Sequence, residues 1–216
     1  APMGTANMLA EQLGIPGDVS DALELLTGDT SVRMIDGMEI DERLYFLNAG
    51  VGVSAKTVRD LNDSSKRRFG IGAYYLIGIA HTFSFRSIKC TVTIDGLSSR
   101  LRVLDVTVIN AGFNLEHPLP GIPSILPDDG KLDMLVIWTP SPLEYLRHLR
   151  RAFLGWKRVR PNIQWRTAES EIRIDSDTPL LVQADGDLIG ETPVTVRVVH
   201  EAVGVLVPST VPQKDD

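Results

Sequence analysis

The feature that most constrains the fold is a series of short runs in which apolar and polar residues alternate, each bounded by glycine, proline or aspartate. The runs KCTVTI and RLRVLDVTVI flank Asp95-Gly96, and the runs between residues 163 and 207 are separated by SDTP, DGDLIGETP and HEAVG. Period-two alternation places every second side chain on one face of a strand. The pattern predicts a mainly β protein with peripheral helices, built as a two-layer antiparallel β-sandwich.

The N-terminal half adds helices to this pattern. Apolar spacing predicts helices over residues 6–13 and 19–26, and a helical region over residues 55–83. Between them, residues 31–52 are typical of a hairpin, for which Asp36-Gly37 would supply the tight turn. A further helix is expected over residues 143–154, and the polar residues 209–216 are expected to form a disordered tail. We find no internal repeat in the sequence.

Composition excludes several classes of protein. A net charge of −6 argues against a general nucleic-acid binder, which needs a surplus of lysine and arginine. Cys90 is the only cysteine, which excludes an internal disulfide and fits a reducing cytoplasm. The apolar run at residues 70–83 is too short to span a bilayer, so we expect a buried helix and a cytoplasmic protein.

Three acidic loops place carboxylates beside a glycine, at Asp36, at Asp128 and Asp129, and at Asp185 and Asp187, and Asp95-Gly96 is a further Asp-Gly pair. Asp36 and Asp95 are interpreted as hairpin turns. The loop PDDGKLD, with Asp128 and Asp129, carries more carboxylate than a turn requires and would suit a hard divalent cation, although a plain turn is the alternative. The loop ADGD follows the apolar run PLLVQ, so its carboxylates either are partly desolvated at the end of a buried strand or belong to a solvated turn.

Two other segments leave alternatives open. The opening PMGTAN precedes a helix, so Gly4 and Thr5 either contact an anion such as a phosphate or only cap that helix. In LEYLRHLRRAFLGWKRVRPNIQW, arginine and lysine alternate with bulky apolar residues. This pattern is typical of a helix on an anionic membrane surface, and equally of a core-facing helix with a solvated basic face. The four histidines lack metal-ligand spacing.

Taken in order, seven motifs resemble the diacylglycerol kinase-like lipid kinases, the bacterial group that is also similar to sphingosine kinases. They are PMGTANMLAEQLGIP, FLNAGVGVSAKTV, KRRFGIGAYYL, VTIDG, VINAG, PDDGKLDMLVI and VQADGDLIGETPVTVRVVHEAVGVLVP. The resemblance covers nearly the whole chain. It implies the C-terminal domain of a two-domain kinase, in which residues 41–208 form the lipid-substrate sandwich and residues 1–40 are a remnant of, or crossover from, an ATP-binding domain.

The resemblance also implies roles for individual residues. Gly4, Thr5 and Asn7 match a nucleotide-binding turn, and Asp129 with the carbonyl groups of Leu126 and Lys131 matches a magnesium loop. Asp187 matches a glutamate that accepts the proton of the lipid hydroxyl, with Asp185 as its catalytic neighbour. Aspartate is one methylene shorter than glutamate, which shortens its reach by roughly 1.5 Å. Met8 is a second departure, because many members have aspartate there.

The family's Gly-Gly-Asp-Gly-Thr phosphate loop does not occur in these 216 residues, so we expect a C-terminal part of such a kinase. The implied reaction transfers the γ-phosphoryl group of ATP to a lipid hydroxyl such as that of diacylglycerol. The implied cofactors are ATP and magnesium, with a lipid substrate, peripheral contact with an anionic membrane and no nucleic acid as partners. A non-catalytic lipid-binding module and an NAD kinase-like enzyme are the alternatives, and the oligomeric state is left open.

Overall fold

The structure, a computed structural model, describes residues 2–3, 7–60, 87–112, 125–138 and 163–209. Its helices are α1 (Met8–Gln12), α2 (Val19–Glu24) and α3 (Val53–Asp60). Its strands are β1 (Thr30–Ile40), β2 (Arg43–Tyr45), β3 (Asn48–Gly52), β4 (Ile88–Ile94), β5 (Leu97–Val103), β6 (Asp105–Ile109), β7 (Leu132–Ile137), β8 (Ile163–Ala168), β9 (Glu171–Asp175), β10 (Leu181–Ala184), β11 (Asp187–Glu191) and β12 (Val194–Pro208).

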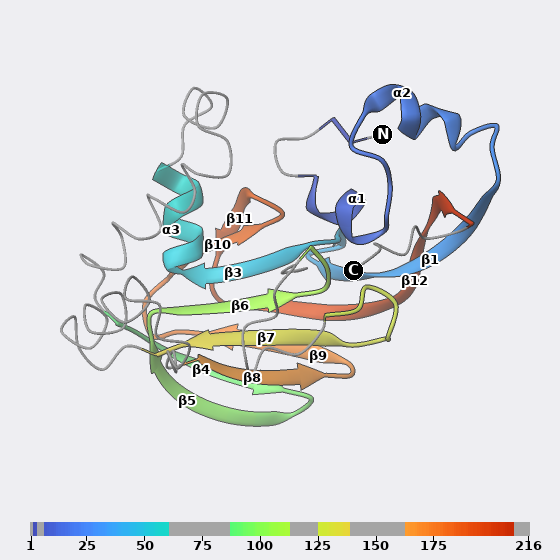
Figure 1. The fold of residues 1–216 in the computed structure, drawn as a ribbon. Helices are drawn as coiled ribbons and strands as arrows, with labels where there is room; N and C mark the ends of the chain where they lie inside the picture. The colour runs from blue at the N-terminus through green and yellow to red at the C-terminus, as the bar shows by residue number, and fades with distance from the viewer. Residues whose placement is uncertain (1, 4–6, 61–86, 113–124, 139–162, 210–216) are drawn as a thin grey trace, which may run out of the picture.

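The strands form two six-stranded sheets that pack face to face (Figure 1). The first sheet has the order β2-β1-β12-β9-β4-β5, and the second has the order β11-β10-β3-β6-β7-β8. All of the pairings between neighbouring strands are antiparallel. The predicted two-layer antiparallel sandwich is confirmed. Residues 30–40, which the sequence analysis placed before the sandwich, pair within its first sheet.

Alternating side chains from both sheets fill the space between them. In the first sheet, Ile172 and Ile174 of β9 face inward beside Val92 of β4, while in the second sheet Val106 and Val108 of β6 do so. Burying an aliphatic side chain of this size contributes about 1.5–3 kcal/mol, so the layer between the sheets dominates stability. Cys90 lies in the same core, where burial raises the pKa of its thiol to about 11 and keeps the thiol protonated.

The order of the strands reveals a two-fold repeat. Each of β1 to β6 can be exchanged with the strand six places later in the chain, so that β1 and β7, β2 and β8, and the remaining pairs change places. The strand order of the first sheet then becomes that of the second sheet read in reverse. Each half supplies four strands to one sheet and two strands to the other, so the halves interlock. This repeat is structural and was not predicted, because the two halves share strand order and turns rather than a visible sequence pattern.

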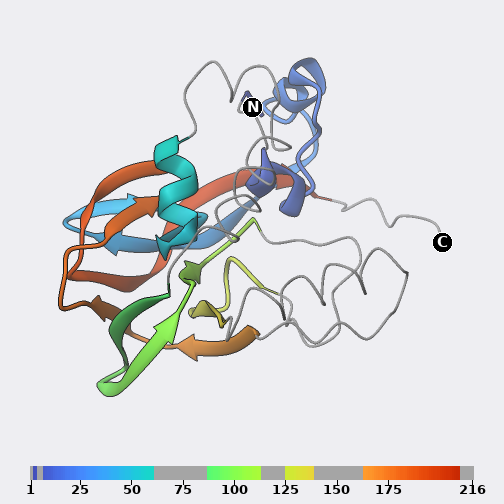
Figure 2. The ribbon, with the colours of Figure 1, turned by 90° about the vertical axis from the view of Figure 1, so that its left-hand side faces the viewer.

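The three helices of the described residues lie at two separate places, as both views show (Figures 1 and 2). Helix α3 packs on β3, β10 and β11 of the second sheet. Helices α1 and α2 lie on the side away from α3, near the ribbon where β1 and β12 run together beyond the sheets. Buried Leu13, which follows α1, packs there against Ile35 and Val207 of that ribbon. None of the helices in the described residues has both the length and the apolar character needed to span a membrane.

The predicted turn at Asp36-Gly37 is wrong. Both residues lie inside β1, and the chain reverses at Asp41 and Glu42, whose φ angles are 49° and 63°. The expected break at HEAVG is also wrong, because β12 continues through it. The predicted first and second helices are confirmed as α1 and α2, and the helical region that begins near residue 55 is confirmed as α3 up to Asp60. Its continuation to residue 83 and the helix expected at residues 143–154 lie outside the described residues.

Candidate functional site

The hairpin β10–β11 carries Asp187, the predicted proton acceptor. Ala184 pairs with Asp187 across a two-residue turn made by Asp185 and Gly186, with φ angles of 49° and 89°. This left-handed turn is the geometry for which Asp-Gly is suited. Asp187 begins β11 and its side chain is exposed. Of the two alternatives for this carboxylate, the structure therefore favours the solvated turn over partial desolvation.

The carboxylate of Asp185, an exposed residue, binds backbone N–H groups of a neighbouring connection. Its Oδ2 accepts a hydrogen bond from the Phe46 N–H at 2.8 Å, and its Oδ1 accepts bonds from the N–H groups of Leu47 and Asn48 at 2.9 and 3.0 Å. Its own N–H donates to the Asn48 carbonyl at 2.9 Å. These bonds clamp the hairpin to the connection between β2 and β3. Asp185, predicted as a catalytic neighbour, is thus placed to fix the turn from which Asp187 projects.

The other half of the repeat contains the same clamp. The turn between β4 and β5 is Asp95-Gly96, as predicted, and the Asp95 carboxylate accepts bonds from the N–H groups of Glu169, Ser170 and Glu171 at 2.9, 2.9 and 3.0 Å. The Asp95 N–H donates to the Glu171 carbonyl, as that of Asp185 does to Asn48. The equivalent of Asp187 is Leu97, which is 80% exposed.

A buried polar layer supports the Asp187 hairpin on the outer face of the second sheet. Gln183, 1% exposed, donates from Nε2 to Oδ1 of Asn48 at 2.7 Å and accepts from the Gly186 N–H at 3.2 Å. Gly50 lies beneath this pair, and a Cβ there would collide with Ser54 Oγ and lie 3.1 Å from Gln183 Nε2. Only glycine leaves room for α3 to approach the sheet this closely.

Asp105 secures the start of α3. Its Oδ1 accepts bonds from the N–H and the hydroxyl of Ser54 at 2.7 and 2.8 Å, and its Oδ2 accepts one from the Thr107 hydroxyl at 2.6 Å. Burial raises the pKa of the Asp105 carboxyl, although these hydrogen bonds oppose the rise. A carboxylate at the first turn of a helix satisfies N–H groups that have no partner inside the helix. Sequence reasoning missed this residue; an aspartate within the apolar run VLDVTVI was the available signal.

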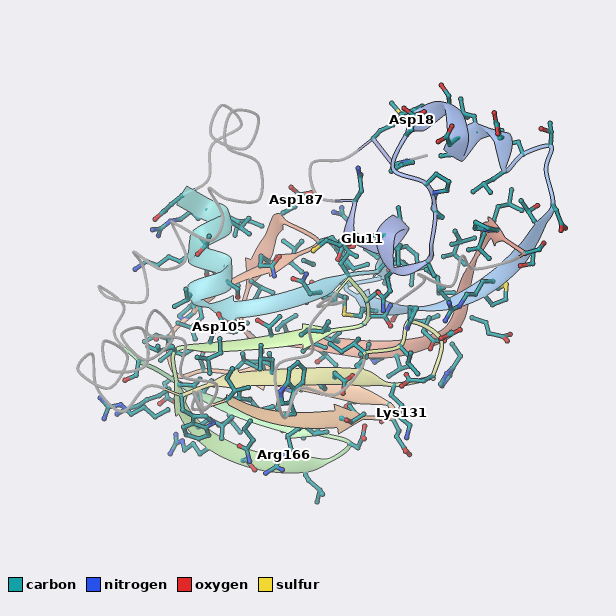
Figure 3. All side chains as sticks on the ribbon, viewed as in Figure 1. Glu11, Asp18, Asp105, Lys131, Arg166 and Asp187 are labelled. Atoms are coloured by element: carbon teal, nitrogen blue, oxygen red, sulfur yellow. The ribbon has the colours of Figure 1, made fainter. Side chains whose placement is uncertain are left out.

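The start of α1 lies beside the connection that Asp185 clamps. Gln12 of α1 accepts from the Gly112 N–H at 2.6 Å, and a Cβ on Gly112 would lie 2.9 Å from the Leu47 side chain and 3.2 Å from Met8 Cβ. Asn7, predicted as a nucleotide contact, is the residue before α1. Gly4 and Thr5, the other two predicted contacts, lie outside the described residues. Figure 3 shows Asp187 on its hairpin and Glu11 on α1.

Asp36 is the centre of a second polar cluster, which joins β1 to the acidic loop and to β12. It is 3% exposed and lies where one residue of β1 stands opposite three residues of β12. Its carboxylate accepts from the N–H groups of Gly130 and Glu201 at 2.7 and 2.9 Å, and its N–H donates to the Pro127 carbonyl at 2.7 Å. The acidic loop at residues 127–131 is therefore tied to β1 and β12. These partners, distant in the sequence, explain why Asp36 is not a turn residue.

Asp128 and Asp129 of the acidic loop differ in their availability. Both oxygens of Asp128 are taken by Arg33, at 2.8 and 2.9 Å. Asp129 accepts only from the Lys131 N–H, at 3.1 Å, as far as the described residues show. Desolvation raises the pKa of nearby Asp133, a hydrogen bond from Thr167 opposes this, and the negative charge of Asp129 adds to the rise. The positive charge of Lys131, in the same loop, lowers this pKa.

The acidic loop carries oxygen atoms of the kind that magnesium prefers. Within the described parts of the chain, no group of three or more histidine, cysteine or acidic side chains could hold a metal. One carboxylate, that of Asp129, and the carbonyl groups predicted from Leu126 and Lys131 form an all-oxygen set, and magnesium keeps several waters in such sites. An open hollow of about 550 Å³ borders the loop, lined in part by Glu169 and His200. Figure 3 shows Lys131 at this loop, apart from Asp187.

Asn110 links the polar cluster around Asp36 to the connection that Asp185 clamps. It is 1% exposed, and its Nδ2 donates to the carbonyl groups of Asp36 and Phe46 at 2.9 and 3.0 Å. Phe46 is also one of the residues whose N–H binds Asp185. Asn110 Oδ1 is buried and has no hydrogen-bond partner among the described residues. Sequence reasoning missed Asn110, although its place in the quoted motif VINAG was a signal.

Comparisons with known proteins agree with this architecture. The family model described as the YegS C-terminal NAD kinase beta sandwich-like domain matches residues 48–207. A crystal structure of a putative diacylglycerol kinase from Bacillus anthracis has the same fold, with a TM-score of 0.72 and 20% identity, over 96% of this chain and 67% of that one.

The matches with curated relatives cover nearly all of this chain but only about half to two thirds of each relative's own length. A probable YegS-like lipid kinase of Pseudomonas savastanoi is 29% identical over 88% of this chain and 61% of its own length. An uncharacterised Synechocystis protein is 25% identical over 96% of this chain, and the match spans 48% of its own length. A diacylglycerol kinase of Staphylococcus carnosus is 23% identical over 97% of this chain and 68% of its own length. The matched model covers most of the chain, which therefore belongs to the family of the YegS C-terminal NAD kinase beta sandwich-like domain.

Proposed function

We propose that this chain is the acceptor half of an ATP-dependent lipid kinase, which transfers the γ-phosphoryl group of ATP to a lipid hydroxyl such as that of diacylglycerol. The observation that carries the proposal is Asp187, an exposed carboxylate on a turn held by Asp185 and Gln183, in which Asp185 binds the connection that borders the start of α1. Relatives named as lipid and diacylglycerol kinases support it.

In the proposed reaction Asp187 accepts the proton of the lipid hydroxyl. The hydroxyl oxygen forms a bond to the γ-phosphorus while the bond from that phosphorus to the β–γ bridging oxygen breaks, and ADP leaves with the electron pair of the broken bond. Proton transfer of this kind contributes typically 10²–10⁴-fold in rate. Positioning and charge stabilisation supply much of the remainder, so the rigidity of the Asp187 turn matters as much as its carboxylate.

The other predicted residues bind the nucleotide, the metal ion and the membrane in the proposed reaction. Asn7, with Gly4 and Thr5, contacts the nucleotide. Asp129, with the carbonyl groups of Leu126 and Lys131, would hold a magnesium ion, which offsets phosphate charge when bound. The basic segment at residues 143–160 contacts an anionic membrane that presents the lipid.

The test uses the protein in its full natural length and radiolabelled ATP. Wild type should transfer label to diacylglycerol in mixed micelles, and Asp187→Asn should lower the rate at least 100-fold because the amide cannot accept the proton. Asp95→Asn, which alters the equivalent clamp in the other half, is the matched control and should keep most of the activity. Label in NAD instead of lipid would favour the NAD kinase-like alternative, which the description of the matched family brings forward.

A further inference from the structure

The repeat offers a way to separate residues that serve the fold from residues that serve the Asp187 site. Asp95 and Asp185 make the same clamp with the same pattern of N–H donors, so this device is common to both halves. A side chain that differs between equivalent positions is therefore not required by the shared clamp and can serve one half only.

The clearest difference beside the turn is at the position two residues before the aspartate. In the half without Asp187 this position is Thr93, whose hydroxyl hydrogen-bonds to Ser98 across its own hairpin at 2.8 Å. In the half with Asp187 it is Gln183, which is almost completely buried and reaches beyond its own hairpin to Asn48 of β3. Burial of a polar side chain is costly without hydrogen bonds, and Gln183 has one at each end of its amide.

These two bonds act on the backbone that carries Asp187. The side-chain oxygen Oε1 of Gln183 accepts a hydrogen bond from the N–H of Gly186, the residue between Asp185 and Asp187. The amide nitrogen of Gln183 is fixed in turn by Asn48, whose own N–H is held by Asp185. Gln183 therefore restrains a glycine in the left-handed region, which otherwise rotates easily.

We propose that Gln183 is a positioning residue that fixes the direction in which the Asp187 side chain projects, acting through Gly186. This inference rests on the proposed function, in which Asp187 accepts the proton of the lipid hydroxyl. A displacement of about 1 Å at a reacting group lowers a rate by about 100-fold, so loss of this restraint acts on turnover more than on substrate binding.

The test compares Gln183→Thr, which copies the other half, and Gln183→Met, which keeps the volume but removes both hydrogen bonds, with the control Thr93→Val. In the 216-residue chain, hydrogen exchange of the Gly186 amide should become at least ten-fold faster in both Gln183 variants, while that of Gly96 stays unchanged. In the full-length protein, kcat for diacylglycerol should fall at least ten-fold, with KM for ATP and lipid within two-fold of wild type. Thr93→Val should change neither readout.

Unchanged Gly186 exchange in both Gln183 variants would overturn the proposal, and so would faster exchange with an unchanged kcat. A wild-type protein that transfers no phosphate to lipid would refute the proposed function instead. The exchange of Gly186 would then still decide whether Gln183 orders the turn.

Discussion

The turns at Asp95 and Asp185 are built alike but lead to different surfaces. Each follows a strand that lies one place from the edge of its sheet, and each has its aspartate and glycine in the left-handed region. Each aspartate binds three backbone N–H groups from a connection between the two sheets. Beyond the glycine the first turn presents Leu97 and the second presents Asp187. The clamp therefore belongs to the fold, and the proposed chemistry depends on the few side chains that differ around it.

The largest effect is expected where the outer faces of the two sheets differ most. Gly50 of β3 is equivalent to Arg173 of β9, which is exposed, whereas Gly50 lies beneath Ser54 of α3. Gly50→Ala should lower the free energy of unfolding by about 1–3 kcal/mol, because the added methyl group overpacks the contact with α3. Arg173→Ala should change it by less than about 0.5 kcal/mol. Urea denaturation of the three proteins measures both, and equal costs would show that α3 does not restrict β3.

The second prediction concerns the clamps themselves. Asp95→Asn and Asp185→Asn should each cost about 1–2 kcal/mol of unfolding free energy, because an amide group presents an N–H where the clamp needs an acceptor. The two costs should agree within about 0.5 kcal/mol in thermal or urea unfolding. A large cost at one turn and none at the other would break the equivalence of the halves.

Part of this architecture could be predicted from the sequence. Asp95-Gly96 and Asp185-Gly186 follow short alternating runs, and both are the tight turns that their local chemistry favours. Asp36-Gly37 has the same dipeptide but lies inside a strand, because Asp36 is drawn into the interior by N–H groups of Gly130 and Glu201. Those partners are 94 and 165 residues away, which no local pattern reports.

The candidate site was predictable in the same limited way. Family resemblance pointed to Asp187, Asp185 and Asp129, but the clamp at Asp185 and the roles of Gln183, Asn110 and Asp105 depend on contacts between strands that are distant in sequence. Buried polar residues within apolar runs were the visible trace of these contacts. The repeat itself leaves almost no sequence pattern, since Gln183 is matched by Thr93 and Asn110 by Val198 at otherwise equivalent backbone positions.

A smaller effect is expected from pH. Desolvation raises the pKa of Asp95, but hydrogen bonds from Glu169, Glu171 and Ser170 outweigh it and bring the pKa to about 2. Because the folded pKa lies below the unfolded value of about 3.9, the ionised clamp stabilises the protein above pH 4, and this contribution is lost as the pH falls towards 2. The stability difference between wild type and Asp95→Asn should therefore shrink over this range in urea titrations. A difference that stays constant from pH 5 to pH 2 would contradict the assignment.

The smallest effect is expected at the acidic loop. Magnesium should bind weakly, in the millimolar range, because one carboxylate and carbonyl groups leave several waters on the ion. Isothermal titration should detect this heat in wild type and lose it in Asp129→Ala. Asp128→Ala is the matched control and should retain binding, since Asp128 is occupied by Arg33. Equal heats from wild type and Asp129→Ala would remove the loop as a magnesium site.

If the two equivalent halves carry a single working site, exchanging the side chains of Asp187 and Leu97 should affect activity in one half only. In the full-length protein, initial rates of phosphate transfer from radiolabelled ATP to diacylglycerol are compared for wild type, Asp187→Leu and Leu97→Asp. Asp187→Leu should lower the rate at least 100-fold, whereas Leu97→Asp should leave it within two-fold of wild type. A fully active Asp187→Leu protein, or an equal loss in both variants, would contradict the claim.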